Sequence, residues 1–148
     1  MSIARDSSGG ASSASAQGRA NRARGARAEV AVVNWLKANG WPDARRYLAG
    51  DGCQPGDIDA IAGVAIEVKD VAKLAWPTWR EQALAEADWR IPIVVRRTRG
   101  VVDAGSWEAH VYDPVNPYPS DAKTVVCPRT GRLWAVSTFA EIVCAVTA

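Results

Sequence analysis

Carboxylate and lysine side chains interrupt the two apolar runs around Gly63, and this interruption constrains the fold more than any other feature of the sequence. The two runs predict a β-hairpin. Side chains alternate between faces along a strand, so Glu67 and Lys69 share one face of the second strand. Asp57 faces the same way as Glu67 only if the numbers of any two residues that pair across the hairpin add up to an even value. A three-residue loop with Gly63 in the left-handed region meets that condition.

Two carboxylates that converge on one point suit a hard divalent cation such as Mg²⁺, which takes oxygen ligands; Mn²⁺ could substitute. Lys69 would then add a positive charge beside the ion. It could position or deprotonate a water, or neutralise charge in the transition state. Asp59 shares the face of Asp57 and is a weaker candidate ligand. The alternative is a surface hairpin with a polar outer face, but clustered like charges are costly without a partner.

The residues Pro55-Gly56-Asp57, followed ten positions after the aspartate by Glu67-Val68-Lys69, resemble the signature of the PD-(D/E)xK nuclease superfamily. The likeness is to its Holliday-junction-resolvase-like branch of archaea and phages, over roughly residues 24–100. Gly56 departs from the pattern, although a Gly-Asp-Ile form is common in phage relatives. The resemblance implies an α/β fold, with a restriction-endonuclease-like mixed β-sheet flanked by helices. It also implies Mg²⁺-dependent hydrolysis of DNA, above all of four-way junctions. The alternatives are a nuclease for linear duplex or flaps, and a DNA-binding protein that does not cleave.

A helix is predicted from Arg19 to Asn39, ended by Gly40, and it carries Glu29 on its apolar stripe. Glu29 is either an edge residue that reaches solvent or an arginine, or, as the resemblance implies, part of the active site. Gln82 lies on a second predicted helix and is either an ordinary surface residue or, by resemblance, a site residue. The catalytic residues implied by the resemblance are therefore Glu29, Asp57, Glu67, Lys69 and Gln82, with Asp57 and Glu67 as the metal ligands.

The charge is unevenly distributed along the chain. Residues 1–50 hold eight Lys and Arg against three Asp and Glu, whereas residues 51–148 hold ten against thirteen. A basic segment joined to an acidic core is expected of an enzyme that holds a polyanion against carboxylates. The alternative for the segment is a solvated basic tail. Strand alternation allows only one of two adjacent arginines near residue 45 to face the site. The DNA-binding candidates are Arg22, Arg24, Arg27, Arg45 and Arg46.

The chain length fits a single domain over residues 19–148, preceded by a disordered Ser/Gly/Ala-rich tail over residues 1–18. A long loop or lid is expected over the proline-rich residues 113–131. The remaining elements are predicted as strands over 44–48, 91–95, 107–112 and 133–136, and helices over 76–89 and 138–146.

Several classes of protein are excluded. The sequence has no apolar run long enough for a membrane span and no signal peptide, so a cytoplasmic protein is expected, in the host cytoplasm if a phage encodes it. Three cysteines without a CxxC pair and a single histidine argue against zinc. A four-way junction needs two opposed cuts, and the chain holds one set of site residues. The resemblance therefore implies a homodimer, for which Trp107, Trp134 and Phe139 could supply apolar surface.

Overall fold

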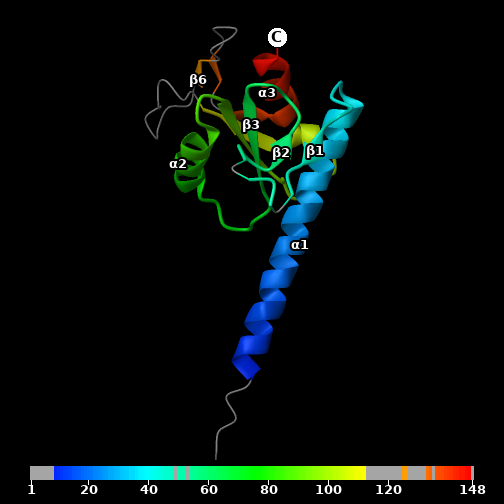
Figure 1. Ribbon diagram of the computed structural model, residues 1–148, viewed down its shortest axis with the longest axis vertical. Helices are drawn as coiled ribbons and strands as arrows, with labels where there is room; N and C mark the ends of the chain where they lie inside the picture. The colour runs from blue at the N-terminus through cyan, green and yellow to red at the C-terminus, as the bar shows by residue number, and fades with distance from the viewer. Residues whose placement is uncertain are drawn as a thin grey trace, which may run out of the picture.

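The computed structural model describes residues 9–48, 50–52, 54–112, 125–126, 133–134 and 136–147. Its architecture is mixed α/β, as predicted, with a six-stranded mixed sheet and three α-helices (Figure 1). The strand order is β1-β2-β3-β4-β5-β8. A separate two-stranded ladder joins β6 to β7.

The bounds of the helices and strands are as follows. The helices are α1 (Gly9–Ala38), α2 (Trp76–Ala87) and α3 (Phe139–Val146), with a short 3₁₀ turn η1 (Ala104–Ser106). The strands of the sheet are β1 (Arg45–Arg46), β2 (Ile58–Asp59), β3 (Val64–Lys69), β4 (Ile91–Arg96), β5 (Glu108–Val111) and β8 (Val136–Thr138). The small ladder consists of β6 (Val125–Val126) and β7 (Leu133–Trp134).

The centre of the sheet is a βαβ unit. Strands β3 and β4 pair in parallel, with Glu67 opposite Val94 and Lys69 opposite Arg96. Helix α2 connects them and begins with Pro77 in its first turn, where the missing N–H of proline costs no helical hydrogen bond. All other strand pairs of the sheet are antiparallel.

The sheet separates two hydrophobic layers. Helices α1 and α3 cover one face, where Val32, Leu36 and Phe139 pack with Ile66 and Ile93 in one buried cluster. Helix α2 covers the other face, where Trp79 and Ala83 pack against Val94 and Tyr112. Since residues alternate along β3, its even-numbered apolar residues point to the α1 side, and Glu67 and Lys69 point to the α2 side.

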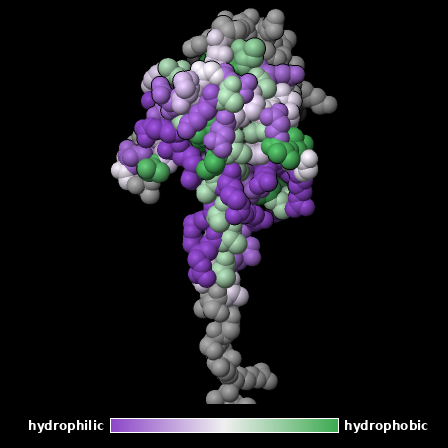
Figure 2. Space-filling model, turned by 90° about the vertical axis from the view of Figure 1, so that its right-hand side faces the viewer, coloured by the Kyte–Doolittle hydropathy of each residue, from purple (hydrophilic) through white to green (hydrophobic). Residues whose placement is uncertain are grey.

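Helix α1 begins ten residues earlier than predicted, at Gly9 instead of Arg19. The prediction of a disordered tail therefore differs from the structure over residues 9–18, while residues 1–8 lie outside the described part. Alanine and serine in this segment are compatible with a helix, and Gln17 donates a hydrogen bond to Asn21 one turn later, at 3.0 Å. The N-terminal part of α1 projects away from the sheet, and hydrophilic residues flank a paler strip along the helix (Figures 1 and 2).

The C-terminal part of the chain differs in detail from the prediction. The predicted strand over 133–136 is divided between β7 and β8, and Thr138 caps α3 by accepting a hydrogen bond from the Glu141 N–H. Apart from β6, the predicted proline-rich loop over 113–131 lies outside the described residues. Trp107 and Phe139 are fully buried in the core, so they are not exposed for a subunit interface. In the described ranges, no helix is both long and apolar enough to span a bilayer.

Candidate active site

The hairpin of β2 and β3 sets Asp57 beside Glu67. Ile58 pairs with Ile66, so the paired numbers sum to an even value, as predicted. Gly63 adopts a φ of 75°, in the left-handed region that the prediction required. The strand ends leave Ala60 to Gly63 between them, one residue more than the predicted loop, because Ala60 is not part of the ladder. The register therefore places the two carboxylates next to each other.

Gly56 lets the chain approach the backbone of β3 directly before Asp57. Its φ is 82°, and a Cβ atom there would lie 2.5 Å from the Ile66 carbonyl oxygen. Only glycine fits this position without strain. The Asp57 N–H donates to the same oxygen at 2.7 Å, and Asp57 Oδ2 accepts from the Val68 N–H at 2.8 Å. One hydrogen bond therefore anchors the backbone of Asp57 to β3, and the other holds its carboxylate.

Glu67 is the acid of the site whose pKa is shifted most clearly. Its side chain is 12% exposed, and burial together with the charge of Asp57 raises its pKa to about 8. Lys69 acts in the opposite direction, with its Nζ atom 4.0 Å from Glu67 Oε1. A carboxyl group that holds its proton to neutral pH is one that gains from a nearby cation.

The second oxygen of Glu67, Oε2, is buried and has no hydrogen-bond partner among the residues that the structure describes. An unsatisfied buried oxygen beside a second carboxylate is a suitable ligand for a hard cation. The described residues contain no group of three or more His, Cys, Asp or Glu side chains that converge on one ion position. Mg²⁺ is usually bound through one or two carboxylates and keeps several waters, so Asp57 and Glu67 fit such an ion.

Glu86 of α2 is a site residue that the sequence interpretation missed. Its charge and a side-chain hydrogen bond to Glu67 contribute to the raised pKa of Glu67. This contact still leaves Glu67 Oε2 unsatisfied. Gln82, the residue predicted from the same helix, is exposed and lies one turn before Glu86 on the same side of α2. The only sequence signal for Glu86 is its position one helical turn after Gln82, and this signal does not show which of the two residues reaches Glu67.

Glu29 and Arg46 form an ion pair away from these residues. Arg46 Nε donates to Glu29 Oε2 at 2.6 Å, and the two side chains are 34% and 19% exposed, respectively. Glu29 thus faces inward from α1, as its stripe predicted, and contacts an arginine. Its assignment to the acid cluster stays a prediction.

Arg45 lies on the opposite face of β1 from Arg46, as strand alternation predicted. It is exposed, and it pairs with Asp59 at 3.1 Å and with Asp51 at 3.7 Å. Asp59 is therefore occupied by an exposed arginine, whereas Asp57 is held against β3.

The predicted DNA-binding arginines Arg22, Arg24 and Arg27 are exposed on α1. Arg24 also lines a pocket with three arginines that the prediction did not include. These are Arg96, Arg97 and Arg99. The sequence signal for them was the basic turn directly after β4.

No family model matches the chain, and no curated protein or solved structure matches it either.

Proposed function

We propose that this protein is a Mg²⁺-dependent endonuclease that hydrolyses DNA phosphodiester bonds. The observation that carries the proposal is the Glu67 carboxyl group, which is buried beside Asp57 with one oxygen unsatisfied and Lys69 next to it. The sequence signature that resembles PD-(D/E)xK nucleases falls on these same three side chains. The restriction-endonuclease-like kind of fold is part of this proposal, and the mixed sheet flanked by helices is compatible with it.

Asp57 and Glu67 would hold the Mg²⁺ ion, and Mn²⁺ could replace it. When bound, the ion supplies Lewis-acid stabilisation of phosphate charge and lowers the pKa of a coordinated water. Lys69 is 23% exposed, so its ammonium group can donate to a phosphate oxygen or orient the nucleophilic water. Glu86 lies close enough to modulate the charge of Glu67. Glu29 would join the cluster only if its pair with Arg46 opened.

The substrate that we propose is branched DNA, with the four-way junction first. The sequence resemblance supports this choice, and the exposed arginines of α1 supply positive charge for binding a polyanion. Two opposed cuts in one junction need two active sites, so the proposal includes a homodimer. Because Trp107 and Phe139 are buried, the interface should use other surfaces.

The test is cleavage of a labelled four-way junction, a linear duplex and a flap, each with and without Mg²⁺. Asp57→Asn, Glu67→Gln and Lys69→Met should each reduce cleavage by on the order of 100-fold or more. Asp59→Asn is the matched control, because Asp59 lies on the same hairpin but pairs with Arg45. Without metal, Asp57→Asn should bind the junction at least as tightly as the wild type, since a negative charge is removed. Glu67→Gln should bind about as tightly as the wild type at neutral pH, where Glu67 holds its proton.

Parental cleavage rates in all three site variants would show that the active site lies elsewhere. A wild-type protein that binds all three DNAs and cuts none would establish the alternative, a DNA-binding protein without nuclease activity. Preference for the duplex or the flap would replace the four-way junction as the substrate and leave the chemistry unchanged.

A further inference from the structure

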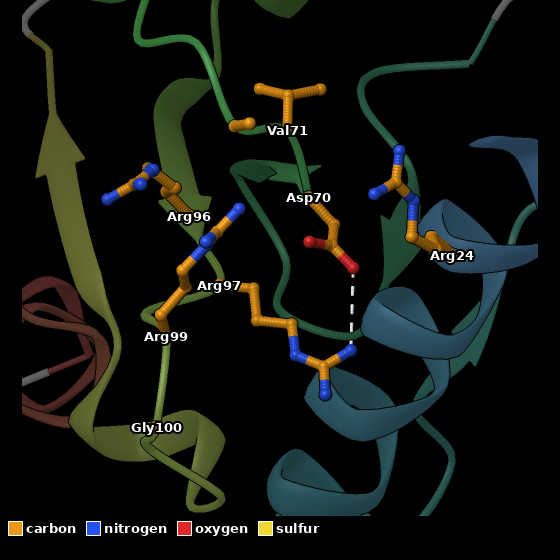
Figure 3. Close-up of a pocket in the computed structure, with 8 residues that line it drawn as sticks. Arg24, Asp70, Val71, Arg96, Arg97, Arg99 and Gly100 are labelled. Atoms are coloured by element: carbon orange, nitrogen blue, oxygen red, sulfur yellow. Dashed lines mark hydrogen bonds and ion pairs between the residues drawn. The ribbon is translucent and has the colours of Figure 1, made fainter.

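A pocket of about 250 Å³ lies at the C-terminal ends of β3 and β4, lined partly by α1 and partly by the turn after β4 (Figure 3). Its lining residues are Arg24, Asp70, Val71, Ala72, Arg96, Arg97, Arg99 and Gly100. Open α/β sheets commonly bind ligands outside the carboxyl ends of their strands. The position therefore suits a ligand, and the lining indicates which kind.

The lining is strongly basic. The guanidinium groups of Arg24, Arg97 and Arg99 lie around one carboxylate, Asp70, and Arg97 pairs with it at 3.4 Å (Figure 3). Arg24 and Arg99 form no ion pair with a carboxylate within the described ranges. Three positive charges around a single carboxylate leave the pocket with an excess of positive charge, so an anion would stabilise it.

Arg96 lines the pocket from the end of β4, but its guanidinium group points away from Asp70 (Figure 3). Its side chain is 16% exposed, and its NH1 atom lies 3.9 Å from a carboxylate oxygen of Glu108. The groups of the pocket that can bind a phosphate are therefore the guanidinium groups of Arg24, Arg97 and Arg99. Arginine binds phosphate through two N–H groups at once, which suits a phosphate group in this pocket.

The pocket is adjacent to the candidate active site. Arg96 pairs with Lys69 across the parallel strands, and Asp70 follows Lys69 directly. The volume of the pocket is below the roughly 300–1,000 Å³ that is usual for small-molecule sites. A single phosphate group therefore fits the pocket better than a whole nucleotide.

We propose that this arginine pocket binds a backbone phosphate of the DNA strand, next to the phosphodiester that is cut. This inference rests on the proposed function for the position of the cut, but the binding itself requires no metal and no cleavage. The same chemistry would also suit free inorganic phosphate, and the experiment separates the two sources.

The experiment measures fluorescence anisotropy of a labelled four-way junction in EDTA, over a series of salt concentrations. The double variant Arg24→Gln/Arg99→Gln should bind about 10-fold more weakly, and the slope of log K against log salt should decrease in magnitude by about 0.9 for one lost phosphate contact. Arg90→Gln is the matched control, because Arg90 directly precedes β4 at the opposite end of that strand. It should leave the affinity and the slope unchanged. Circular dichroism checks that both variants are folded.

A second arm titrates inorganic phosphate into the wild type and the double variant by calorimetry. Phosphate binding that the double variant loses, together with unchanged DNA affinity and slope, would assign the pocket to free phosphate and overturn the proposal. Unchanged DNA binding with no phosphate binding would also overturn it, and would leave the arginines as solvated surface groups. If the wild type and the double variant bind the junction as expected but no DNA is cut, the proposed nuclease is refuted and the assignment of the pocket stands.

Discussion

Replacing Glu67 by glutamine should remove a pH dependence of folding stability that the wild type shows near neutral pH. The pKa of Glu67 is raised from 4.5 to about 8 in the folded protein, chiefly by burial and secondly by Asp57. Between these two values the folded chain holds a proton that the unfolded chain has lost. The free energy of unfolding therefore falls as the pH rises through this window.

The magnitude follows from the linkage of one proton. The slope reaches about 1.4 kcal/mol per pH unit where the two states differ by one whole proton. From pH 6.5 to pH 8 the folded carboxyl group is partly titrated, so the expected loss is about 1.5 kcal/mol. Glu67→Gln cannot ionise, and its amide can still donate a hydrogen bond to Glu86. The variant should therefore be insensitive to pH at this position.

The window above pH 6.5 is chosen because of His110. Burial lowers the pKa of His110, so its contribution has the opposite sign: stability rises with pH until the unfolded histidine loses its proton at about pH 6.5. At pH 6.5 half of the unfolded histidines still hold a proton, so a small rise continues to about pH 7.5. This rise is the same in the wild type and in Glu67→Gln, so the difference between the two proteins reports Glu67. Urea unfolding without divalent cations, at intervals from pH 6.5 to pH 8, measures both proteins under the same conditions.

If the free energy of unfolding declined equally with pH in the wild type and in Glu67→Gln, the reasoning would be refuted, because the proton would then belong to another group. A flat wild-type profile would do the same, since Glu67 would then titrate as an ordinary exposed carboxyl group.

Four further results are expected. Mg²⁺ should stabilise the wild type more at pH 8 than at pH 6.5 in thermal unfolding, because the ion displaces the proton of Glu67, and it should stabilise Glu67→Gln little at either pH. Gly56→Ala should destabilise the fold by at least about 2 kcal/mol in urea unfolding, and Gly40→Ala, which has a positive φ but open space around it, by only about 1 kcal/mol; equal costs would refute the close approach. Glu29→Gln should cost about 1 kcal/mol through loss of its charge-assisted bond to Arg46, without changing stabilisation by Mg²⁺; loss of that stabilisation would return the residue to the metal site. Light scattering should give the mass of a dimer, and a monomer both free and junction-bound would contradict paired cutting.

The hairpin register could be predicted because it depends only on local rules. Strand side chains alternate, and Gly63 provides the positive φ that the turn between β2 and β3 needs. Glu86 could not be predicted in the same way. Its place beside Glu67 depends on how α2 is rotated against the sheet, and the packing of Trp79 and Ala83 sets that rotation. Sequence periodicity defines a side of the helix but not the height at which it meets a strand.

The partner of Glu29 was equally beyond local rules. The helical stripe predicted that Glu29 faces inward, and strand alternation predicted that Arg45 and Arg46 face apart. The choice between the two arginines depends on which face of β1 meets α1, and this is a property of the assembled sheet. The arginine pocket combines α1 with the turn after β4, so its composition likewise emerges only from the tertiary fold.

The two halves of the proposed DNA site differ in how far apart their residues lie along the chain. Asp57 and Glu67 are ten residues apart and meet through one hairpin, whereas Arg24 and Arg99 are 75 residues apart. Loop-closure entropy makes the longer contact roughly 2 kcal/mol more costly to form, and long-range contacts are the slow ones in folding. The carboxylates can therefore come together as soon as the hairpin closes, but the arginines meet only when α1 has docked on the sheet. A partly unfolded chain would lose its hold on phosphate before it lost its acidic pair.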